Sequence, residues 1–337
     1  MIKEAEKRVK FLLSVEKLKT YYPIKRGVLS KTVGYIKAVD GVNFKIYPGE
    51  TLGLVGESGC GKSSIGRTIL RLEDPTEGSI FFNDEDIAAY SNKRMINIRT
   101  DLQIIFQDPY SSLNPKKRIY DILAEPLKVH KIIPEDKISD EIDKLLDWVE
   151  LPKSFKNRYP NEFSGGQRQR VGIARALALR PKLIVCDEPV SALDVSTQAQ
   201  VLNLLKDLQK KLKLTYLFIA HGLGAVKYIS NRIAVMYLGK IVEIASTEEI
   251  FANPKHPYTK ALLSAYPIPN PHMRDKKRII LEGDVPSPAN PPNGCRFHTR
   301  CKFTKDICSR ETPELKQVKG VEKEEHLSAC FFQDSFN

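Results

Sequence analysis

The sequence predicts an α/β protein in which helices cover a parallel β-sheet and a helical block interrupts the alternation of strands and helices. Three features lead to this prediction. Short apolar segments alternate with amphipathic ones, and a glycine-rich loop, "GESGCGKS", joins one apolar segment to a helical pattern. From about Tyr120 to Leu179 the pattern is helical. Alternating strands and helices are typical of a parallel sheet with helices on its faces.

The N-terminal part is predicted to be rich in β-structure. Alternating or apolar runs broken by proline and glycine occur in "FLLSVEKLKTYY" and "GVNFKIYPGE". The short apolar strand "TLGLVG" follows and leads through the glycine loop into the helical pattern "SSIGRTILRLE". Two more short strands are predicted at "SIFFND" and "LQIIFQD".

The second half of the chain contains further strands and helices and then a different kind of segment. Within "KISDEIDKLLDWVEL", helical spacing places five apolar residues on one face: Ile138, Ile142, Leu145, Leu146 and Val149. "KLIVCDEP" and "TYLFIAHG" are predicted as buried strands, and "STQAQVLNLLKDLQKKL" between them as an amphipathic helix. After Ile250 proline becomes dense, which predicts an extended connection to a separate small module.

Composition and charge limit the class of protein. No run of about eighteen apolar residues occurs, and the charged N-terminus lacks the apolar core of a signal peptide, so we expect a cytosolic protein. The net charge of +12 fits nucleic acid, an anionic membrane surface or an anionic ligand, and equally a solvated basic surface. In a reducing cytosol, the six cysteines are expected to be thiols or metal ligands.

The glycine-rich loop at residues 56–63 matches the pattern G-x-x-x-x-G-K-[ST] between a strand and a helix, the context that this pattern requires. Its glycines allow turns that point backbone N–H groups at an anion, and the helix N-terminus adds partial positive charge. Lys62 would reach the β- and γ-phosphates, and the Ser63 hydroxyl can ligate Mg²⁺. A chance glycine turn is the alternative. The flanking strand and helix favour a nucleoside triphosphate site.

Two acidic residues follow the apolar segment "KLIVC". This strand would deliver Asp187 and Glu188 to its carboxyl end, where the ligands of such sheets collect. Asp187 would hold Mg²⁺ directly or through water, and Glu188 could polarise an attacking water as general base. A solvated turn is the alternative, and the phosphate loop upstream makes it the weaker interpretation.

The segment "EFSGGQRQR" at residues 162–170 narrows the class further. Ser164 and two glycines precede a helical pattern and form a second anion site at a helix N-terminus. Alone, S-G-G-Q would indicate no more than an ordinary cap. Placed between the two preceding motifs, it resembles the signature of the nucleotide-binding subunit of an ATP-binding cassette (ABC) transporter.

This resemblance implies a P-loop ABC ATPase with a RecA-like parallel-sheet core, an N-terminal antiparallel β-subdomain and an inserted helical subdomain at about residues 108–180. It implies that the catalytic residues are Glu188, His221, Gln107 and Lys62, and that Mg²⁺ is held by Ser63, Gln107 and Asp187. The residues expected to bind ATP are Tyr22, Gly56, Glu57, Ser58, Gly59, Cys60, Gly61, Lys62, Ser63, Ser64, Gln107, Ser164, Gly165, Gly166, Gln167 and Asp187.

Individual roles follow from the same resemblance. Tyr22 would stack on adenine, and Tyr21 is the near alternative for this role. The other interpretation of Tyr22 is an aromatic of the hydrophobic core at the end of a strand. His221 resembles the switch histidine near the γ-phosphate. Residues 164–167 would contact the γ-phosphate held by the opposite subunit, and "SALD" at residues 191–194 would cross the dimer interface. One departure is Gly222, where the family usually has an acidic residue, and we expect it to loosen the start of the following helix.

A second resemblance covers nearly the whole chain. Three segments are similar to ATP-binding subunits of bacterial oligopeptide/dipeptide (and nickel) importers: "FQDPYSSLNP", "HPYTKALLSA" and "VPSPANPPNGCRFHTRC". Such importers have two different ATP-binding subunits, and this chain resembles the one usually named second. The resemblance implies an ABC domain at residues 1–265 and a C-terminal module at residues 266–337. The implied partners are a paralogous ATPase subunit or a second copy, two membrane permeases and, indirectly, an extracellular binding protein. The protein would work at the cytoplasmic face of the membrane.

Two functions other than peptide import are compatible with some features of the sequence. The basic charge and the cysteines also suit a nucleic-acid- or ribosome-associated ABC ATPase, but such proteins have two cassettes, a long coiled-coil insertion or cysteines at the N-terminus. A structural zinc-bearing assembly factor is the other rival, and the intact Glu188 argues against it. We therefore expect no nucleic-acid partner.

Four cysteines gather near the C-terminus with the spacing C-x5-C-x6-C-x21-C: Cys295, Cys301, Cys308 and Cys330. The tight knuckles of structural zinc sites are absent, and some members of the importer family carry a [4Fe–4S] cluster on such cysteines. The cluster is therefore expected. Zinc with His298 or His326 as substitute ligand, and unliganded thiols, remain the alternatives. Because the tail is expected to lie far from the cassette, replacing Cys308 should leave ATP binding largely intact.

Overall fold

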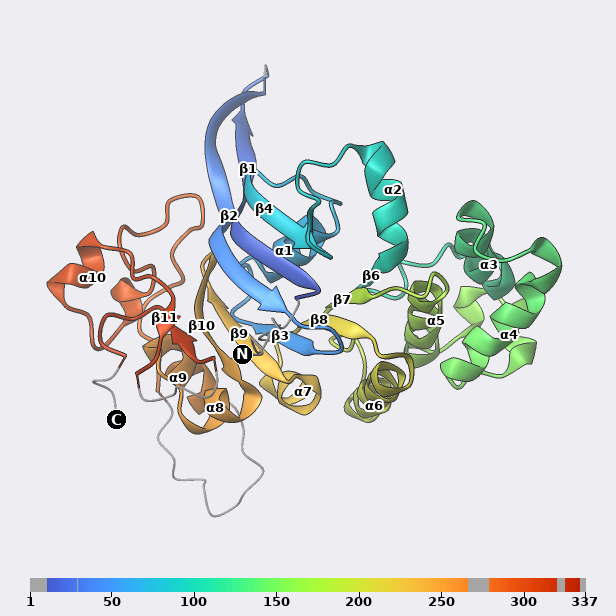
Figure 1. The fold of residues 1–337 in the computed structure, drawn as a ribbon. Coiled ribbons are helices and arrows are strands. Elements are labelled where there is room, and N and C mark those ends of the chain that lie inside the picture. Colours follow the sequence, from blue (N-terminus) through green and yellow to red (C-terminus); the bar gives the residue numbers. More distant parts are fainter. Residues whose placement is uncertain (1–10, 29, 266–278, 320–324, 334–337) are drawn as a thin grey trace, which may run out of the picture.

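The computed structural model of the chain describes residues 11–28, 30–265, 279–319 and 325–333. Two β-sheets and a group of helices make up this part of the chain (Figure 1). Helices α3, α4 and α5 lie together at one side of the sheets, and the C-terminal tail lies at the opposite side (Figure 1). The α/β class predicted from the sequence is confirmed.

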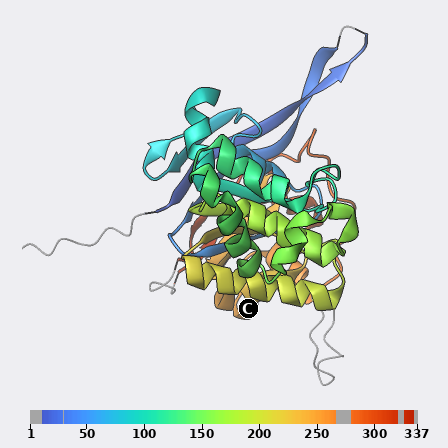
Figure 2. The ribbon, with the colours of Figure 1, turned by 90° about the vertical axis from the view of Figure 1, so that its right-hand side faces the viewer.

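The N-terminal sheet is antiparallel, as the resemblance implied. Its order is β2-β1-β4-β5, and its first two strands pair along almost their whole length. They continue to Arg26 opposite Lys31 and form a long hairpin that projects from the body of the protein (Figures 1 and 2). The strands are β1 (Leu13–Arg26), β2 (Lys31–Ile46), β4 (Glu77–Phe82) and β5 (Glu85–Asp86).

The core sheet is mixed, in the order β11-β12-β10-β9-β3-β8-β7-β6. The strands from β9 to β6 pair in parallel, whereas β10, β12 and β11 are antiparallel to their neighbours. Strands β3, β7 and β8 are buried along their whole length, as apolar strands covered on both faces should be. The strands are β3 (Thr51–Val55), β6 (Leu102–Ile105), β7 (Leu183–Asp187), β8 (Thr215–Ile219), β9 (Arg232–Tyr237), β10 (Lys240–Ser246), β11 (Lys316–Gln317) and β12 (Leu327–Ser328).

The helices follow the predicted apolar patterns closely. The five apolar residues of the predicted amphipathic helix at residues 138–149 are all buried. The α-helices are α1 (Lys62–Ile69), α2 (Asn92–Asp101), α3 (Ile119–Val129), α4 (Ile138–Trp148), α5 (Gly165–Leu177), α6 (Val195–Leu212), α7 (Leu223–Ile229), α8 (Thr247–Ala252), α9 (Pro257–Ser264) and α10 (Asp306–Arg310). The short 3₁₀ helices are η1 (Glu135–Lys137), η2 (Lys153–Asn157), η3 (Pro160–Glu162) and η5 (His298–Arg300). Among the described residues, none of the helices combines the length and apolar character needed to cross a bilayer.

The C-terminal tail is joined to the core rather than separate from it. Strand β12 pairs with β10 through Glu243 opposite Ser328 and Ile244 opposite Leu327. The tail thereby covers the outer edge of β10, whose backbone groups would otherwise be unpaired. The expectation of a separate module, far from the cassette, is wrong for this reason. The boundary predicted at residue 265 precedes residues 266–278, which lie outside the described part.

Candidate nucleotide site

The phosphate loop lies between β3 and α1, as predicted. Glycine is required at two of its positions because a Cβ on Gly56 would lie 2.1 Å from the Met236 carbonyl oxygen, and one on Gly61 would lie 2.0 Å from that of Ala38. Gly61 also has a φ of 106° where it caps α1. The backbone of this loop can therefore form a tight turn whose N–H groups bind an anion.

Lys62 is folded into the loop and almost fully buried. Its Nζ donates hydrogen bonds to the carbonyl oxygens of Gly56 at 2.8 Å and Glu57 at 3.1 Å, and it lies 3.4 Å from Nδ1 of His221. The ammonium group thus lies inside the turn of the loop, where a lysine of this motif can bind β- and γ-phosphates.

Two of the three residues predicted to bind Mg²⁺ are in contact. Ser63, in the first turn of α1, donates a hydrogen bond of 2.7 Å to Oδ1 of Asp187, the last residue of β7. A hydroxyl and a carboxylate oxygen held side by side are ligands that suit Mg²⁺. This donor pair fits the metal that the resemblance implies.

Glu188 brings three of the predicted catalytic residues together. The Gln107 amide donates a hydrogen bond of 2.9 Å to its Oε2, and Nε2 of His221 lies 2.6 Å from its Oε1. Glu188 has a buried side chain and a left-handed backbone conformation, with a φ of 50°. Such a conformation is uncommon outside glycine and occurs preferentially at functional sites. A carboxylate oriented by two partners beside the phosphate loop can act as a general base.

The two tyrosines considered for adenine stacking have different surroundings. Tyr22 donates a hydrogen bond of 3.1 Å to Oγ of Ser64 in α1, and its hydroxyl also contacts Glu73. Tyr21 instead donates to Asp40 at 2.5 Å. Tyr22 therefore lies beside the helix that follows the phosphate loop, and Tyr21 points to a different set of partners.

The signature residues are not brought to the phosphate loop of the same chain. Ser164 caps α5, because its Oγ accepts a hydrogen bond from the Gln167 N–H at 3.3 Å while the Gln167 side chain accepts from the Ser164 N–H at 3.0 Å. Helix α5 lies apart from α1 (Figure 1). A Cβ on Gly166 would lie 2.3 Å from the Thr197 side chain, so α5 and α6 pack closely there. Asp194 of the "SALD" segment caps α6, accepting from the Thr197 N–H at 3.0 Å.

Two other residues of interest lie near this site, Gly222 and Cys60. Gly222 begins α7 with no side-chain hydrogen bond at its cap, so the helix lacks the stabilisation that an acidic residue would supply. Cys60 is buried within the phosphate loop, and burial raises the pKa of its thiol. A thiol that stays protonated is unreactive.

No pattern in the sequence indicates the residues that hold Glu57. Its backbone N–H donates a hydrogen bond of 2.9 Å to the hydroxyl of Tyr258 in α9. Its carboxylate is bound by Arg300 of the tail, 243 positions further along the chain, at 2.9 and 3.2 Å. Arg300 lies between two of the conspicuous cysteines, and only the contact itself reveals its importance.

The four cysteines of the tail line one small cavity of about 20 Å³ together with aromatic side chains. Burial, reinforced by the neighbouring cysteines, raises the pKa of Cys295 to about 11 and that of Cys330 to about 12. His298 lines the same cavity, whereas His326 is buried elsewhere, with its Nε2 at 2.8 Å from Glu243. In the described ranges, no group of three or more His, Cys, Asp or Glu side chains is placed to hold a metal ion. The iron–sulfur cluster is therefore not shown.

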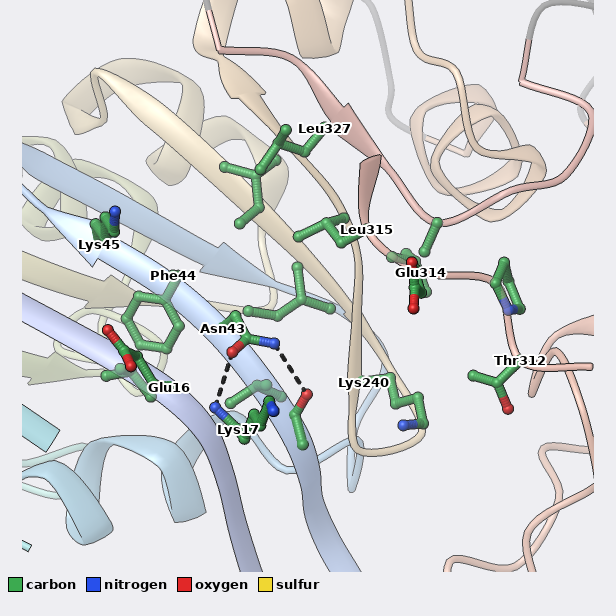
Figure 3. Close-up of a pocket in the computed structure, with 18 of the residues that line it drawn as sticks. Glu16, Lys17, Asn43, Phe44, Lys45, Lys240, Thr312, Glu314, Leu315 and Leu327 are labelled. Atoms are coloured by element: carbon green, nitrogen blue, oxygen red, sulfur yellow. Dashed lines mark hydrogen bonds between the residues drawn. The ribbon is translucent and has the colours of Figure 1, made fainter. Parts of the chain in front are cut away.

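A wider groove of about 980 Å³ lies between the N-terminal sheet and the tail. One wall is formed by β1 and β2, where Asn43 accepts a hydrogen bond from the Lys17 N–H at 2.8 Å (Figure 3). Glu314 and Leu315 of the tail form the opposite wall (Figure 3). The residues that line this groove do not include those of the phosphate loop, so it is distinct from the nucleotide site.

Comparison with known proteins gives two matching families. The family described as "ABC transporter" matches residues 39–191, and the one described as "Oligopeptide/dipeptide transporter, C-terminal region" matches residues 242–308. The oligopeptide transport ATP-binding protein AppF of Bacillus subtilis (strain 168) is 51% identical over 95% of this chain and 96% of its own. The oligopeptide transport ATP-binding protein OppF of Salmonella typhimurium (strain LT2) is 50% identical, over 91% and 93% respectively.

Solved structures agree with these matches and confirm the predicted P-loop ABC ATPase fold. A dimeric ATP-binding cassette bound to ADP and phosphate after hydrolysis superimposes with a TM-score of 0.62 and 28% identity, covering 70% of this chain and 98% of its own. CbiO1 of Clostridium perfringens, part of an ABC transporter complex, gives the same TM-score and identity over 72% of this chain and 91% of its own.

Proposed function

Because the chain belongs to the ABC transporter family, among the ATP-binding proteins of oligopeptide transport, we propose that it hydrolyses ATP to drive import of di- or oligopeptides across the bacterial cytoplasmic membrane. The observation that carries this proposal is the joint placement of Lys62, Glu188 and His221 at the phosphate loop, in a chain whose tail matches the peptide-transporter region. A nucleic-acid-associated ATPase is not favoured, because the curated relatives reported above are named for oligopeptide transport.

Hydrolysis in this site is a matter of positioning and charge. Lys62 and the loop N–H groups would hold the phosphates, and Ser63, Asp187 and Gln107 would hold Mg²⁺, which supplies charge neutralisation for the transferred phosphoryl group. Glu188 would accept a proton from the attacking water, oriented by the two partners that its carboxylate already has. His221 joins Glu188 to the γ-phosphate end of the site through its contact with Lys62.

The separation of α5 from α1 supports a head-to-tail dimer. Each ATP would lie between the phosphate loop of one subunit and residues 164–167 of the other, so that ATP favours the closed dimer and hydrolysis reopens it. The partner would be a paralogous ATPase subunit or a second copy. Two membrane permeases at the cytoplasmic face of the membrane, and indirectly an extracellular binding protein, would complete the importer.

Uptake by living cells tests this function. In a strain lacking the chain, uptake of labelled di- or oligopeptides should fall to background and return with the wild-type protein. The variant Glu188→Gln, expressed at the same level, should not restore it. Normal peptide uptake in the deletion strain, with every other ATP-binding subunit of this family also removed, would exclude peptide import.

We further propose that Cys295, Cys301, Cys308 and Cys330 hold a [4Fe–4S] cluster. The support is that four thiols and an aromatic shell surround one cavity, and that each iron of a cubane takes its own thiolate, so the sulfur atoms need not converge on one point. The donor set fits a cluster, whereas about 20 Å³ is room for one water molecule, so the side chains would have to move outward.

Anaerobically purified protein should be brown, absorb near about 400 nm and contain about four irons per chain. Colourless protein with one zinc, or with no metal, would exclude the cluster.

A further inference from the structure

Arg300 of the tail contacts the phosphate loop. The Arg300 guanidinium lies 2.9 Å from Oε2 and 3.2 Å from Oε1 of Glu57, the second residue of the loop. Only 8% of the Arg300 side chain and 27% of the Glu57 side chain are exposed. This ion pair is therefore partly withdrawn from water, where charge interactions are stronger than at an exposed surface.

Glu57 is held through its backbone as well as its side chain. Its N–H donates to the hydroxyl of Tyr258, which is fully buried and packs against Tyr237 at 4.8 Å and Phe297 at 5.5 Å between ring centroids. Phe297 and Arg300 belong to the same short turn of the tail, around η5. One turn thus supports the position of Glu57 from two directions.

The charge of Glu57 makes this support important for an anionic ligand. A carboxylate in a loop that receives the β- and γ-phosphates would repel them, and the Glu57 carbonyl oxygen is also a hydrogen-bond acceptor for Lys62. Arg300 neutralises the carboxylate and draws it toward the tail. The loop N–H groups and Lys62 then act on the phosphates without an opposing charge beside them.

We propose that Arg300 is a positioning residue for the nucleotide, which sets ATP affinity through Glu57 and so makes the tail part of the ATP site. This inference rests on the proposed ATPase function, and it deepens it by assigning a role in ATP binding to the peptide-transporter tail. Arg300 would act through the loop. The contacts described for it are with Glu57 and Tyr237, and they do not include Glu188.

ATP binding by the full chain tests the proposal. Arg300→Ala should raise the Kd for MgATP by about tenfold, because it removes one partner of a partly buried ion pair. It should raise KM for ATP similarly and change kcat by less than about twofold, since Arg300 does not touch the reacting atoms. Arg300→Lys keeps the charge and should regain part of the affinity for ATP.

Lys302→Ala is the matched control. Lys302 is exposed, lies two positions away in the same segment, and pairs with Glu282 at 3.9 Å.

A double-mutant cycle separates charge compensation from general stability. If Arg300 acts by neutralising Glu57, then Arg300→Ala should weaken ATP binding much less in a Glu57→Gln background than in the wild type. An equal loss in both backgrounds, or no loss in either, would overturn the inference. If Arg300→Ala does not fold, Arg300→Gln gives the same cycle with a side chain of similar length. Failure of the wild type itself to bind ATP would instead contradict the proposed function.

Discussion

At the scale of single residues, Glu188 has a position that depends on several parts of the chain at once. Its backbone N–H donates to the Ile219 carbonyl oxygen at the end of β8, and its carboxylate meets Gln107 and His221 from two other loops. The left-handed φ of 50° turns the chain sharply after β7, which places the side chain of Glu188 apart from that of Asp187. In the proposed mechanism, the adjacent carboxylates of Asp187 and Glu188 would thereby serve two tasks, metal binding and proton transfer.

Replacing Glu188 by glutamine should separate binding from hydrolysis. The amide has the same shape and can keep hydrogen bonds to Gln107 and His221, but it cannot accept the proton of the attacking water. We expect kcat to fall by about a hundredfold or more, with the Kd for MgATP within about threefold of the wild type. Phosphate release and binding of a fluorescent ATP analogue measure the two quantities. Hydrolysis at more than about a tenth of the wild-type rate would remove Glu188 from the role of general base.

The positions of individual residues were predictable where a motif fixes the local geometry. Lys62, Ser63 and Asp187 could be placed from spacing alone, because a loop between a strand and a helix leaves little freedom. Arg300 could not, because its partner Glu57 is distant in the sequence and an arginine beside a cysteine has no characteristic pattern. Its contact depends on how the tail packs, which is a tertiary property.

At the scale of elements, helix α9 shows how a buried histidine can control a helix start. His256 is the N-cap of α9, and its Nδ1 accepts a hydrogen bond from the Tyr258 N–H at 3.1 Å. The Glu243 carboxylate on β10 accepts from the His256 N–H at 2.9 Å and also contacts His326 at 2.8 Å. Burial lowers the pKa of His256 to about 4, against the opposing effect of Glu243. A protonated Nδ1 could no longer accept the capping hydrogen bond.

This pKa predicts how stability changes with pH. The unfolded chain binds a proton at His256 near pH 6.5, whereas the folded protein resists it until about pH 4. The contribution of His256 to the free energy of unfolding is therefore complete above pH 6.5 and is lost as the pH falls from 6.5 to 4. At pH 5 the loss amounts to about 2 kcal/mol. Thermal melts at pH 7 and pH 5 measure it. His256→Asn keeps a capping acceptor that does not titrate and should reduce this pH dependence, and His130→Asn serves as the control. An unchanged slope in His256→Asn would contradict the prediction.

The elements themselves were predictable where periodicity is strong. Helix α4 and strands β3, β7 and β8 were expected near their observed positions, because each carries a clear apolar pattern. The segments "FLLSVEKLKTYY" and "GVNFKIYPGE" were predicted as β-structure, whereas no element was predicted for "PIKRGVLSKTVGYIKAV" between them, which has weak alternation. Cross-strand pairing from Tyr22 opposite Ile36 to Arg26 opposite Lys31 supplies the order that the local pattern does not indicate.

At the scale of the whole molecule, the tail is a structural part of the cassette. Strand β12 extends the core sheet, Arg296 contacts Asp40 within β2 of the N-terminal sheet, and Arg300 binds Glu57 in the phosphate loop. The sequence suggested a separate module because prolines separate the tail from the cassette along the chain. Distance along the chain says little about distance in the fold, and short pairings such as Ile244 with Leu327 are too local to be seen in a pattern.

This attachment changes what should happen when a tail cysteine is replaced. Sequence alone predicted that Cys308→Ser would leave ATP binding largely intact. In the structure, the Cys308 carbonyl oxygen accepts a hydrogen bond from the Cys295 N–H at 2.8 Å, which closes the segment that carries Arg300. If the four cysteines hold a cluster, its loss would free Cys301, the neighbour of Arg300. We therefore expect Cys308→Ser to bleach the protein and to raise the Kd for MgATP by about threefold.

The same ATP-binding measurement, repeated in two further variants, identifies the route of this effect. In a Glu57→Gln background the loss caused by Cys308→Ser should shrink, because the ion pair through which it acts is already altered. Ser309→Ala is the matched control, since Ser309 is the exposed neighbour of Cys308 and its hydroxyl donates a hydrogen bond within α10, to the Asp306 carbonyl oxygen at 2.8 Å. An unchanged Kd in bleached Cys308→Ser protein would show that the cysteines stabilise the tail without influencing the phosphate loop.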